Sequence, residues 1–127
     1  MSVKKTIQTR LYVEDLPLVL EVLAAKGFAY RRNSNVTGFQ QSFEIAVKVG
    51  ERYCLGLSRT REGGETFFEL HADSAYLKGE RFARLKGELE AQVKALQIRR
   101  QLARHGYVLA GSEENGERIV LRIRQAV

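Results

Sequence analysis

The last part of the chain, residues 117–124, alternates strictly between apolar and other side chains. Successive side chains of a β-strand point to opposite faces, so Ile119, Leu121 and Ile123 share one face of this segment. The other face carries Arg118, Val120, Arg122 and Arg124. The segment therefore predicts a strand with one face on a core and one basic face in solvent.

The rest of the chain shows the same kind of periodicity, so its elements can be assigned in order. Alternation predicts strands over residues 5–13, 28–32, 39–49, 52–59, 66–72, 107–110 and 117–124, with turns at 33–35 and 111–116. Apolar residues at helical spacing predict helices over residues 15–26 and 78–104, ended by Gly27 and Gly106. The order predicts an α+β fold: a two-layer sandwich with a mostly antiparallel sheet, both helices on one face, and a ferredoxin-like core with extra strands.

The apolar phase of each element predicts one core between the sheet and both helices. Its expected members are Ile7, Leu11, Phe43, Ile45, Val47, Leu55, Leu57, Leu70, Leu89, Leu96, Ile119, Leu121 and Ile123.

Length and composition are those of one ordinary domain spanning residues 1–127, with 44% apolar and 28% charged residues. No apolar run has the length of a signal peptide or of a membrane span, so we expect a cytoplasmic protein that does not enter a membrane. The single Cys54 lies in an apolar run and is expected to behave as a small buried side chain.

Positive charge is concentrated near the end of the chain. Residues 78–127 carry eleven Lys and Arg against six Glu, a balance of +5 out of the total of +6. Such asymmetry is compatible with an anionic partner, although a solvated surface is its commoner explanation.

Three motifs carry a resemblance to a known family. They are Tyr53-Cys54-Leu55-Gly56-Leu57-Ser58-Arg59, Phe68-Glu69-Leu70-His71-Ala72-Asp73, and a helix that ends in His105-Gly106-Tyr107. With Thr6-Ile7-Gln8-Thr9 at the start and Val36-Thr37-Gly38-Phe39-Gln40 before the meander, the chain resembles small uncharacterised proteins of cyanobacteria and algal plastid genomes, a domain of unknown function. That resemblance implies an accessory role, working with an AAA-type ATPase system. The chain departs from the family pattern after Asp73, where Ser74-Ala75-Tyr76 replaces a tryptophan pair.

No catalytic or cofactor motif accompanies these elements, so we expect a protein that is not an enzyme and holds no cofactor or metal. His71 shares a strand face with Glu69 and Asp73, but a single strand rarely closes a metal site. His105 precedes the glycine that ends the long helix, where capping is the better interpretation.

The long helix carries a second apolar stripe made of Ala91, Ala95, Ile98 and Leu102. We predict that this stripe binds a partner protein or a second copy of the chain; the alternative is that the C-terminal hairpin covers it. A different function, binding of single-stranded nucleic acid or another polyanion, would use Arg118, Arg122, Arg124, Arg10 and Tyr12.

Overall fold

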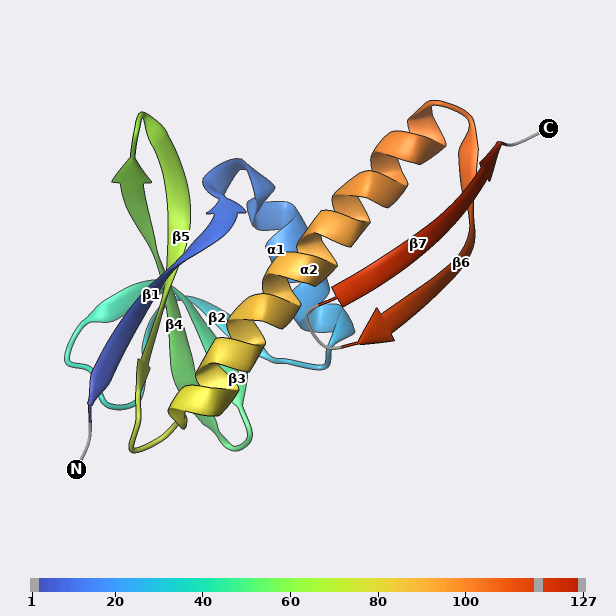
Figure 1. The fold of residues 1–127 in the computed structure, drawn as a ribbon. Coiled ribbons are helices and arrows are strands. Elements are labelled where there is room, and N and C mark those ends of the chain that lie inside the picture. Colours follow the sequence, from blue (N-terminus) through green and yellow to red (C-terminus); the bar gives the residue numbers. More distant parts are fainter. Residues whose placement is uncertain (1–2, 116–117, 126–127) are drawn as a thin grey trace.

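A computed structural model describes residues 3–115 and 118–125 of the chain. These residues form a five-stranded sheet, two α-helices and a separate two-stranded ribbon, arranged as in Figure 1. In chain order the elements are β1 (Lys4–Tyr12), a 3-10 turn η1 (Val13–Asp15), α1 (Leu16–Ala25), β2 (Tyr30–Asn35), β3 (Ser42–Val49), β4 (Arg52–Glu62), β5 (Glu65–Asp73), α2 (Gly79–Arg104), β6 (Tyr107–Asn115) and β7 (Arg118–Gln125). The predicted α+β class, with two helices against an antiparallel sheet, is confirmed.

The sheet has the strand order β1-β5-β4-β3-β2, and every neighbouring pair is antiparallel. Strands β2 to β5 form a continuous meander, and β1 is added to its far edge. The ferredoxin-like core that the sequence suggested is wrong, because that fold has two strands between its helices whereas four lie between α1 and α2 here.

Two of the expected turns are strands. Residues 33–35 belong to β2, where Asn33 takes a positive φ of 49° while the strand stays paired with β3. Residues 111–115 continue β6 beyond the short strand predicted at 107–110. In both places, backbone pairing with a neighbouring strand outweighs the local turn preference of the residues.

The main core lies between the sheet and both helices, which cover the same face (Figure 1). Leu11, Ile45, Val47, Leu55, Leu57, Leu70 and Leu89 are buried there as predicted, and Ile7 and Leu96 are partly buried against it. Pro17 stands in the first turn of α1, and Gly27 follows its end with a φ of 82°.

The opposite face of the sheet carries a second, smaller apolar cluster. Phe43 was predicted for the main core, but it packs instead with Val36 and Ala46. A Cβ on Gly56 would meet the Phe43 ring at 2.9 Å, so the ring occupies space that any other residue at position 56 would fill. The loop before β3 closes over this cluster, and Phe39 from it packs against Phe43 with ring centroids 5.1 Å apart.

An irregularity in β4 explains two further differences from the expected faces. Val47 pairs with Leu55 and Lys48 with Tyr53, so Cys54 is an extra residue in β4. The bulge moves Tyr53 to the smaller cluster and Cys54 into the main core. Burial raises the pKa of the Cys54 thiol, as expected for a small buried side chain.

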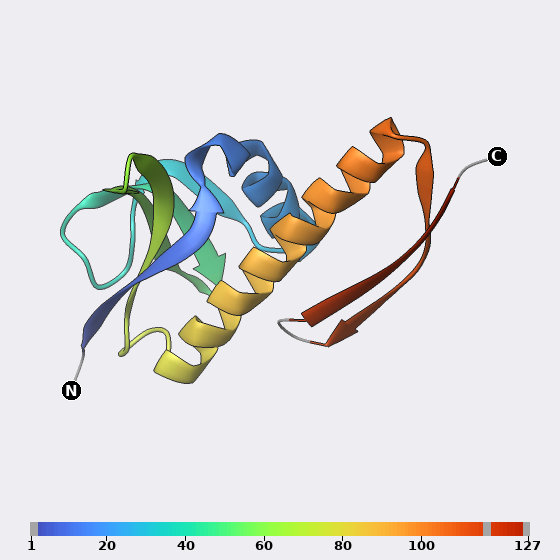
Figure 2. The ribbon, with the colours of Figure 1, turned by 45° about the horizontal axis from the view of Figure 1, so that its top comes forward.

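The β6–β7 ribbon is a separate antiparallel sheet that lies along the C-terminal half of α2, away from β1 (Figures 1 and 2). Ile119 and Leu121 are half-buried and lie outside the main core, so their predicted place in a single core is wrong. The side chain of Ile123 lies outside the described residues. Alternation along β7 is confirmed, since Arg118, Val120, Arg122 and Arg124 are exposed. Within the described residues, no helix combines the length and apolar character needed to cross a bilayer.

Candidate binding groove along α2

An open groove of about 1430 Å³ runs over α2. Its floor is α2, one wall is the end of β1 with the β4–β5 turn, and the other wall is β7. Figures 1 and 2 show α2 passing between β1 and the ribbon. We call this the α2 groove.

The second stripe of α2 lies in this floor. Ala91, Ala95, Ile98 and Leu102 all line the groove, together with Ile119 and Leu121 of the ribbon. Ala95 is buried, whereas Ala91, Ile98 and Leu102 are half-buried. The ribbon packs against α2, as the alternative of a covering C-terminal hairpin expected, and the stripe still faces an open groove.

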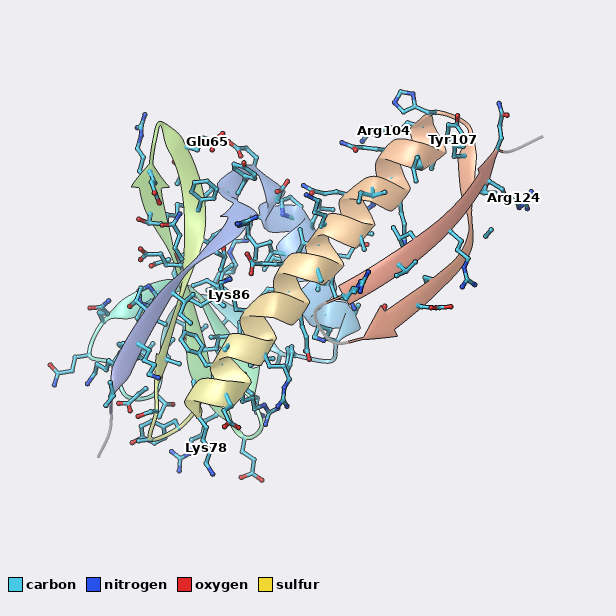
Figure 3. The ribbon with its side chains drawn as sticks, viewed as in Figure 1. Glu65, Lys78, Lys86, Arg104, Tyr107 and Arg124 are labelled. Atoms are coloured by element: carbon cyan, nitrogen blue, oxygen red, sulfur yellow. The ribbon has the colours of Figure 1, made fainter. Side chains whose placement is uncertain are left out.

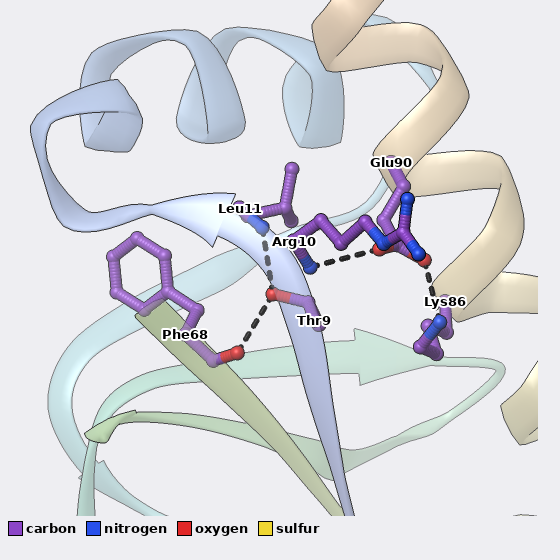
Figure 4. A network of polar contacts seen from close by, with 6 residues as sticks. All are labelled: Thr9, Arg10, Leu11, Phe68, Lys86 and Glu90. Carbon is purple, nitrogen blue, oxygen red and sulfur yellow. Dashed lines mark hydrogen bonds and ion pairs between the residues drawn. The ribbon is translucent and has the colours of Figure 1, made fainter. Parts of the chain in front are cut away.

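The β1 wall is built on an irregular strand end. Pairing of β1 with β5 is interrupted between Gln8 and Tyr12. The buried Thr9 hydroxyl bridges the gap, since it donates to the Phe68 carbonyl at 2.7 Å and accepts from the Leu11 N–H at 3.0 Å (Figure 4). These bonds satisfy backbone groups that the interrupted pairing would leave unpaired.

The same irregularity fixes Arg10 against α2. The Arg10 N–H points away from β5 and donates to Glu90 Oε2 at 2.8 Å, while Lys86 Nζ donates to Glu90 Oε1 at 2.7 Å (Figure 4). The Glu90 carboxylate thus takes the place of a strand carbonyl at the free edge of β1. A carboxylate at this point hinders a further strand from pairing with β1 along the groove.

An aromatic pair stands at the mouth of the groove. Tyr12 and Phe67 have ring centroids 4.9 Å apart, and Tyr12 remains 39% exposed. They add exposed apolar surface to the groove beyond the stripe of α2.

Charges in the lining are balanced in number, and three of the four carboxylates lie on one wall. Four cationic residues, Arg10, Lys86, Lys94 and Arg118, stand against four carboxylates, Asp15, Glu62, Glu65 and Glu90. Asp15, Glu62 and Glu65 lie on the wall of β1 and the β4–β5 turn, and Arg118 lies on the β7 wall. Figure 3 shows Glu65 and Arg124 on opposite sides of α2.

The residues proposed for nucleic-acid binding are divided by the fold. Arg10, Tyr12 and Arg118 line the α2 groove beside the second stripe. Arg122 and Arg124 are exposed on the ribbon, and Arg122 pairs with Glu113 at 2.6 Å. Sequence reasoning missed the carboxylates of the groove, because Asp15, Glu62 and Glu65 come from turns and the groove brings them together only through the tertiary fold.

A second polar cluster lies on the outer face of the sheet around His71. Its Nδ1 lies 2.9 Å from Thr6 Oγ1, and its Nε2 lies 2.6 Å from Ser58 Oγ and 3.6 Å from a Glu69 oxygen. Burial holds the pKa of His71 below its ordinary value, against the opposing attraction of Glu69. A neutral imidazole donates from one nitrogen and accepts at the other, so both hydroxyl contacts are satisfied without charge.

The Ser58–His71 pair has the distance of a nucleophile and its base. It stands within a sheet, however, with the His71 side chain only 12% exposed and the Phe43 ring 4.9 Å from the imidazole. We interpret the cluster as a structural one, in which polar side chains satisfy one another's hydrogen bonds beside the neighbouring aromatic residues. Asp73 is buried and accepts from the Ala75 N–H, and within residues 3–115 and 118–125 no His, Cys, Asp and Glu gather as a metal site.

Comparison with models of protein families, with curated proteins and with solved structures finds no match. The function of the α2 groove is therefore inferred from its own geometry and chemistry.

Proposed function

We propose that this protein is a non-catalytic module that binds another protein in the α2 groove. The observation that carries the proposal is an open groove with an apolar floor, an aromatic pair of which Tyr12 is exposed, and balanced charges. Protein interfaces combine these features, with apolar and aromatic residues at the centre and charged residues around them.

The size of the groove supports a macromolecular partner. Pockets for small ligands usually enclose about 300–1,000 Å³ and bury most of their ligand. The α2 groove is larger, at about 1430 Å³, and it is open along its length. A folded element of a partner fills such a space better than a small molecule does.

The proposal can be tested by placing a photo-reactive phenylalanine analogue at Ala91, in the floor of the groove. Ala83 provides the matched control, because it is an exposed alanine on α2 that does not line the groove. Irradiation in cells should yield a protein adduct from position 91 and none from position 83. Mass spectrometry of the adduct would name the partner, including the AAA-type ATPase that the sequence resemblance suggests.

Two results would overturn the proposal. One is the absence of any protein adduct at position 91 in a variant whose circular dichroism and unfolding match the wild type. The other is the same adducts in equal yield from both positions, which would indicate unspecific collisions.

The second candidate function is polyanion binding, favoured by the exposure of Arg118, Arg122 and Arg124 on one face of β7. The α2 groove gives it no support, because its four carboxylates offset the attraction of its four cationic residues for a phosphate backbone. If the arginines do bind nucleic acid, changing all three to Glu should abolish a salt-sensitive shift with mixed-sequence single strands. A wild type that shows no shift at low salt removes this candidate.

A further inference from the structure

We propose that the partner is a second copy of this chain, whose β6–β7 ribbon lies in the α2 groove while its own groove receives the first ribbon. This inference rests on the proposed function, since it names the occupant of the same groove. It joins two surfaces of one molecule that complement each other in charge and in apolar exposure.

The ribbon carries exposed apolar side chains that its own packing leaves uncovered. Among the described residues, the large apolar side chains that stay exposed are Val3, Tyr12, Tyr76, Tyr107, Val108 and Val120. Three of them belong to the ribbon, and Tyr12 stands at the mouth of the groove. A soluble surface usually scatters such residues, so their accumulation on one ribbon and at one groove indicates an interface.

The register of the ribbon places charge on the same face as Val108 and Val120. Val108 pairs with Arg124, and Glu113 pairs with Val120. Arg118, Val120, Arg122 and Arg124 alternate with the inward-facing Ile119 and Leu121, and Figure 3 shows Arg124 directed away from α2. Glu113 lies on this face as well and pairs with Arg122, so the outer face of the ribbon keeps an excess of positive charge from Arg118 and Arg124 around an apolar centre.

The groove offers the opposite charge. Its wall of β1 and the β4–β5 turn carries Asp15, Glu62 and Glu65 next to the Tyr12–Phe67 pair. One arginine, Arg10, also lies on that wall; Glu90 accepts from its backbone N–H, and its guanidinium opposes only one of the three carboxylates. The positive charge of the ribbon complements the carboxylates of this wall, and Val120 at its centre complements the aromatic pair.

The ribbon also gains stability from a second packing surface. An isolated two-stranded ribbon is marginal in water, and this one packs mainly on α2. Docking in a partner's groove would cover its outer face as well.

Reciprocal exchange also closes the assembly. When each ribbon enters the other copy's groove, the two contacts are related by a two-fold axis. Both grooves are then filled, so no third copy can bind and the assembly does not grow into a polymer. The product is a dimer with the same contact made twice.

Charge reversal tests the pairing directly. One variant, Glu62→Lys with Glu65→Lys, makes the wall basic; the other, Arg122→Glu with Arg124→Glu, makes the ribbon acidic. Each variant alone should bring like charges together in both contacts and weaken the dimer by more than about tenfold, measured by sedimentation equilibrium. Mixed in equal amounts, the two variants should form a heterodimer, because both of its contacts again join opposite charges.

Glu51→Lys provides the control, since Glu51 is exposed at the β3–β4 turn and does not line the groove. It should leave the dimer unchanged. Circular dichroism and thermal unfolding of every variant establish that its fold is intact.

A monomeric wild type at tens of micromolar, or a mixture that fails to re-form the dimer, overturns the inference. If each charge-reversed variant still formed the dimer, the dimer would use another surface, and the inference would again be overturned. The proposed function has a separate outcome: an adduct from position 91 with a different protein sustains protein binding while rejecting the second copy, and an adduct with residues 107–125 of a second copy supports both.

Discussion

At the scale of single residues, polar side chains in this fold replace backbone pairing where the sheet is irregular. Thr9 bridges the interruption in β1, and Glu90 takes the outward N–H of Arg10. These contacts hold the end of β1 and Tyr12 in place beside α2. The shape of the groove wall thus depends on a few hydrogen bonds that no apolar periodicity reveals.

Replacement of Thr9 by Val should lower the free energy of unfolding by about 1–3 kcal/mol, because the buried Phe68 carbonyl and Leu11 N–H would lose their partner. Thr9→Ser keeps the hydroxyl and should cost only about 1 kcal/mol for the missing methyl group. Urea denaturation of both variants separates the two effects. Val keeps the methyl group and loses only the hydroxyl, so a Thr9→Val variant as stable as the wild type would mean that the hydroxyl contributes nothing at this position.

His71 should make stability depend on pH in a defined direction. Its folded pKa lies below the unfolded value of about 6.5, so the unfolded chain binds more protons between the two values. Stability should therefore be fully present above about pH 6.5 and should fall as the pH drops through the folded pKa. Urea denaturation across this range should show the loss in the wild type.

His71→Asn should flatten that dependence, because the titrating group is gone. His105→Asn serves as the control, since it removes the other histidine of the sequence at an exposed position beyond the end of α2. A slope that persists in the His71 variant would assign the pH dependence to carboxylates such as Glu44, whose pKa is lowered by its hydrogen bond with Arg59.

At the scale of elements, the ribbon and the sheet differ in how they are stabilised. Leu89 of α2 is fully buried in the main core, whereas Leu121 of β7 is half-buried in the α2 groove. Leu89→Ala should reduce the global free energy of unfolding by about 2–5 kcal/mol. Leu121→Ala should instead increase amide hydrogen exchange in the ribbon with little change in global stability, because the ribbon can open without the sheet.

Urea denaturation and hydrogen exchange measured by mass spectrometry distinguish these effects. If Leu121→Ala destabilised the whole fold as much as Leu89→Ala, the ribbon and the sheet would unfold as one cooperative unit.

Periodicity in the sequence predicted the elements well and their faces less well. The helical spacing of Leu85, Leu89 and Val93 identified the buried side of α2, and alternation identified the inner face of β3 at Ile45 and Val47. The extra residue Cys54 reverses the phase of β4 at one point. Such a bulge is set by pairing with β3, so the sequence of β4 alone does not reveal it.

The position of the ribbon could not be predicted for a related reason. Ile119 and Leu121 alternate as in a strand with one apolar face. Such a face can pack on a helix, as it does on α2 here, as well as on the core of a larger sheet, so alternation does not distinguish the two. The second stripe of α2 was found from its spacing, but the opposite wall of the groove comes from turns at residues 13–15 and 62–65. Only the tertiary fold brings these turns beside α2.

At the scale of the whole molecule, charge is arranged along one direction across α2. Carboxylates gather at the β4–β5 turn and η1, and exposed arginines gather on the outer face of the ribbon. The net charge of +6 conceals this arrangement, because it sums over both ends. Opposite charges at two ends of one molecule favour association of copies, whereas a uniform positive surface would favour polyanions.

Such association should make the protection of the ribbon depend on protein concentration. A dimer that covers the outer face of the ribbon stabilises its closed state by mass action, so ribbon amides should exchange more slowly as the concentration rises through the dissociation constant. The exchange rates of amides in the core strands β4 and β5 should change much less, because these strands stay paired in the monomer. In the Arg122→Glu, Arg124→Glu variant the ribbon should exchange at one rate at all concentrations. Concentration-independent protection in the wild type would mean that α2 alone holds the ribbon closed, and the exposed Tyr107, Val108 and Val120 would then need another partner.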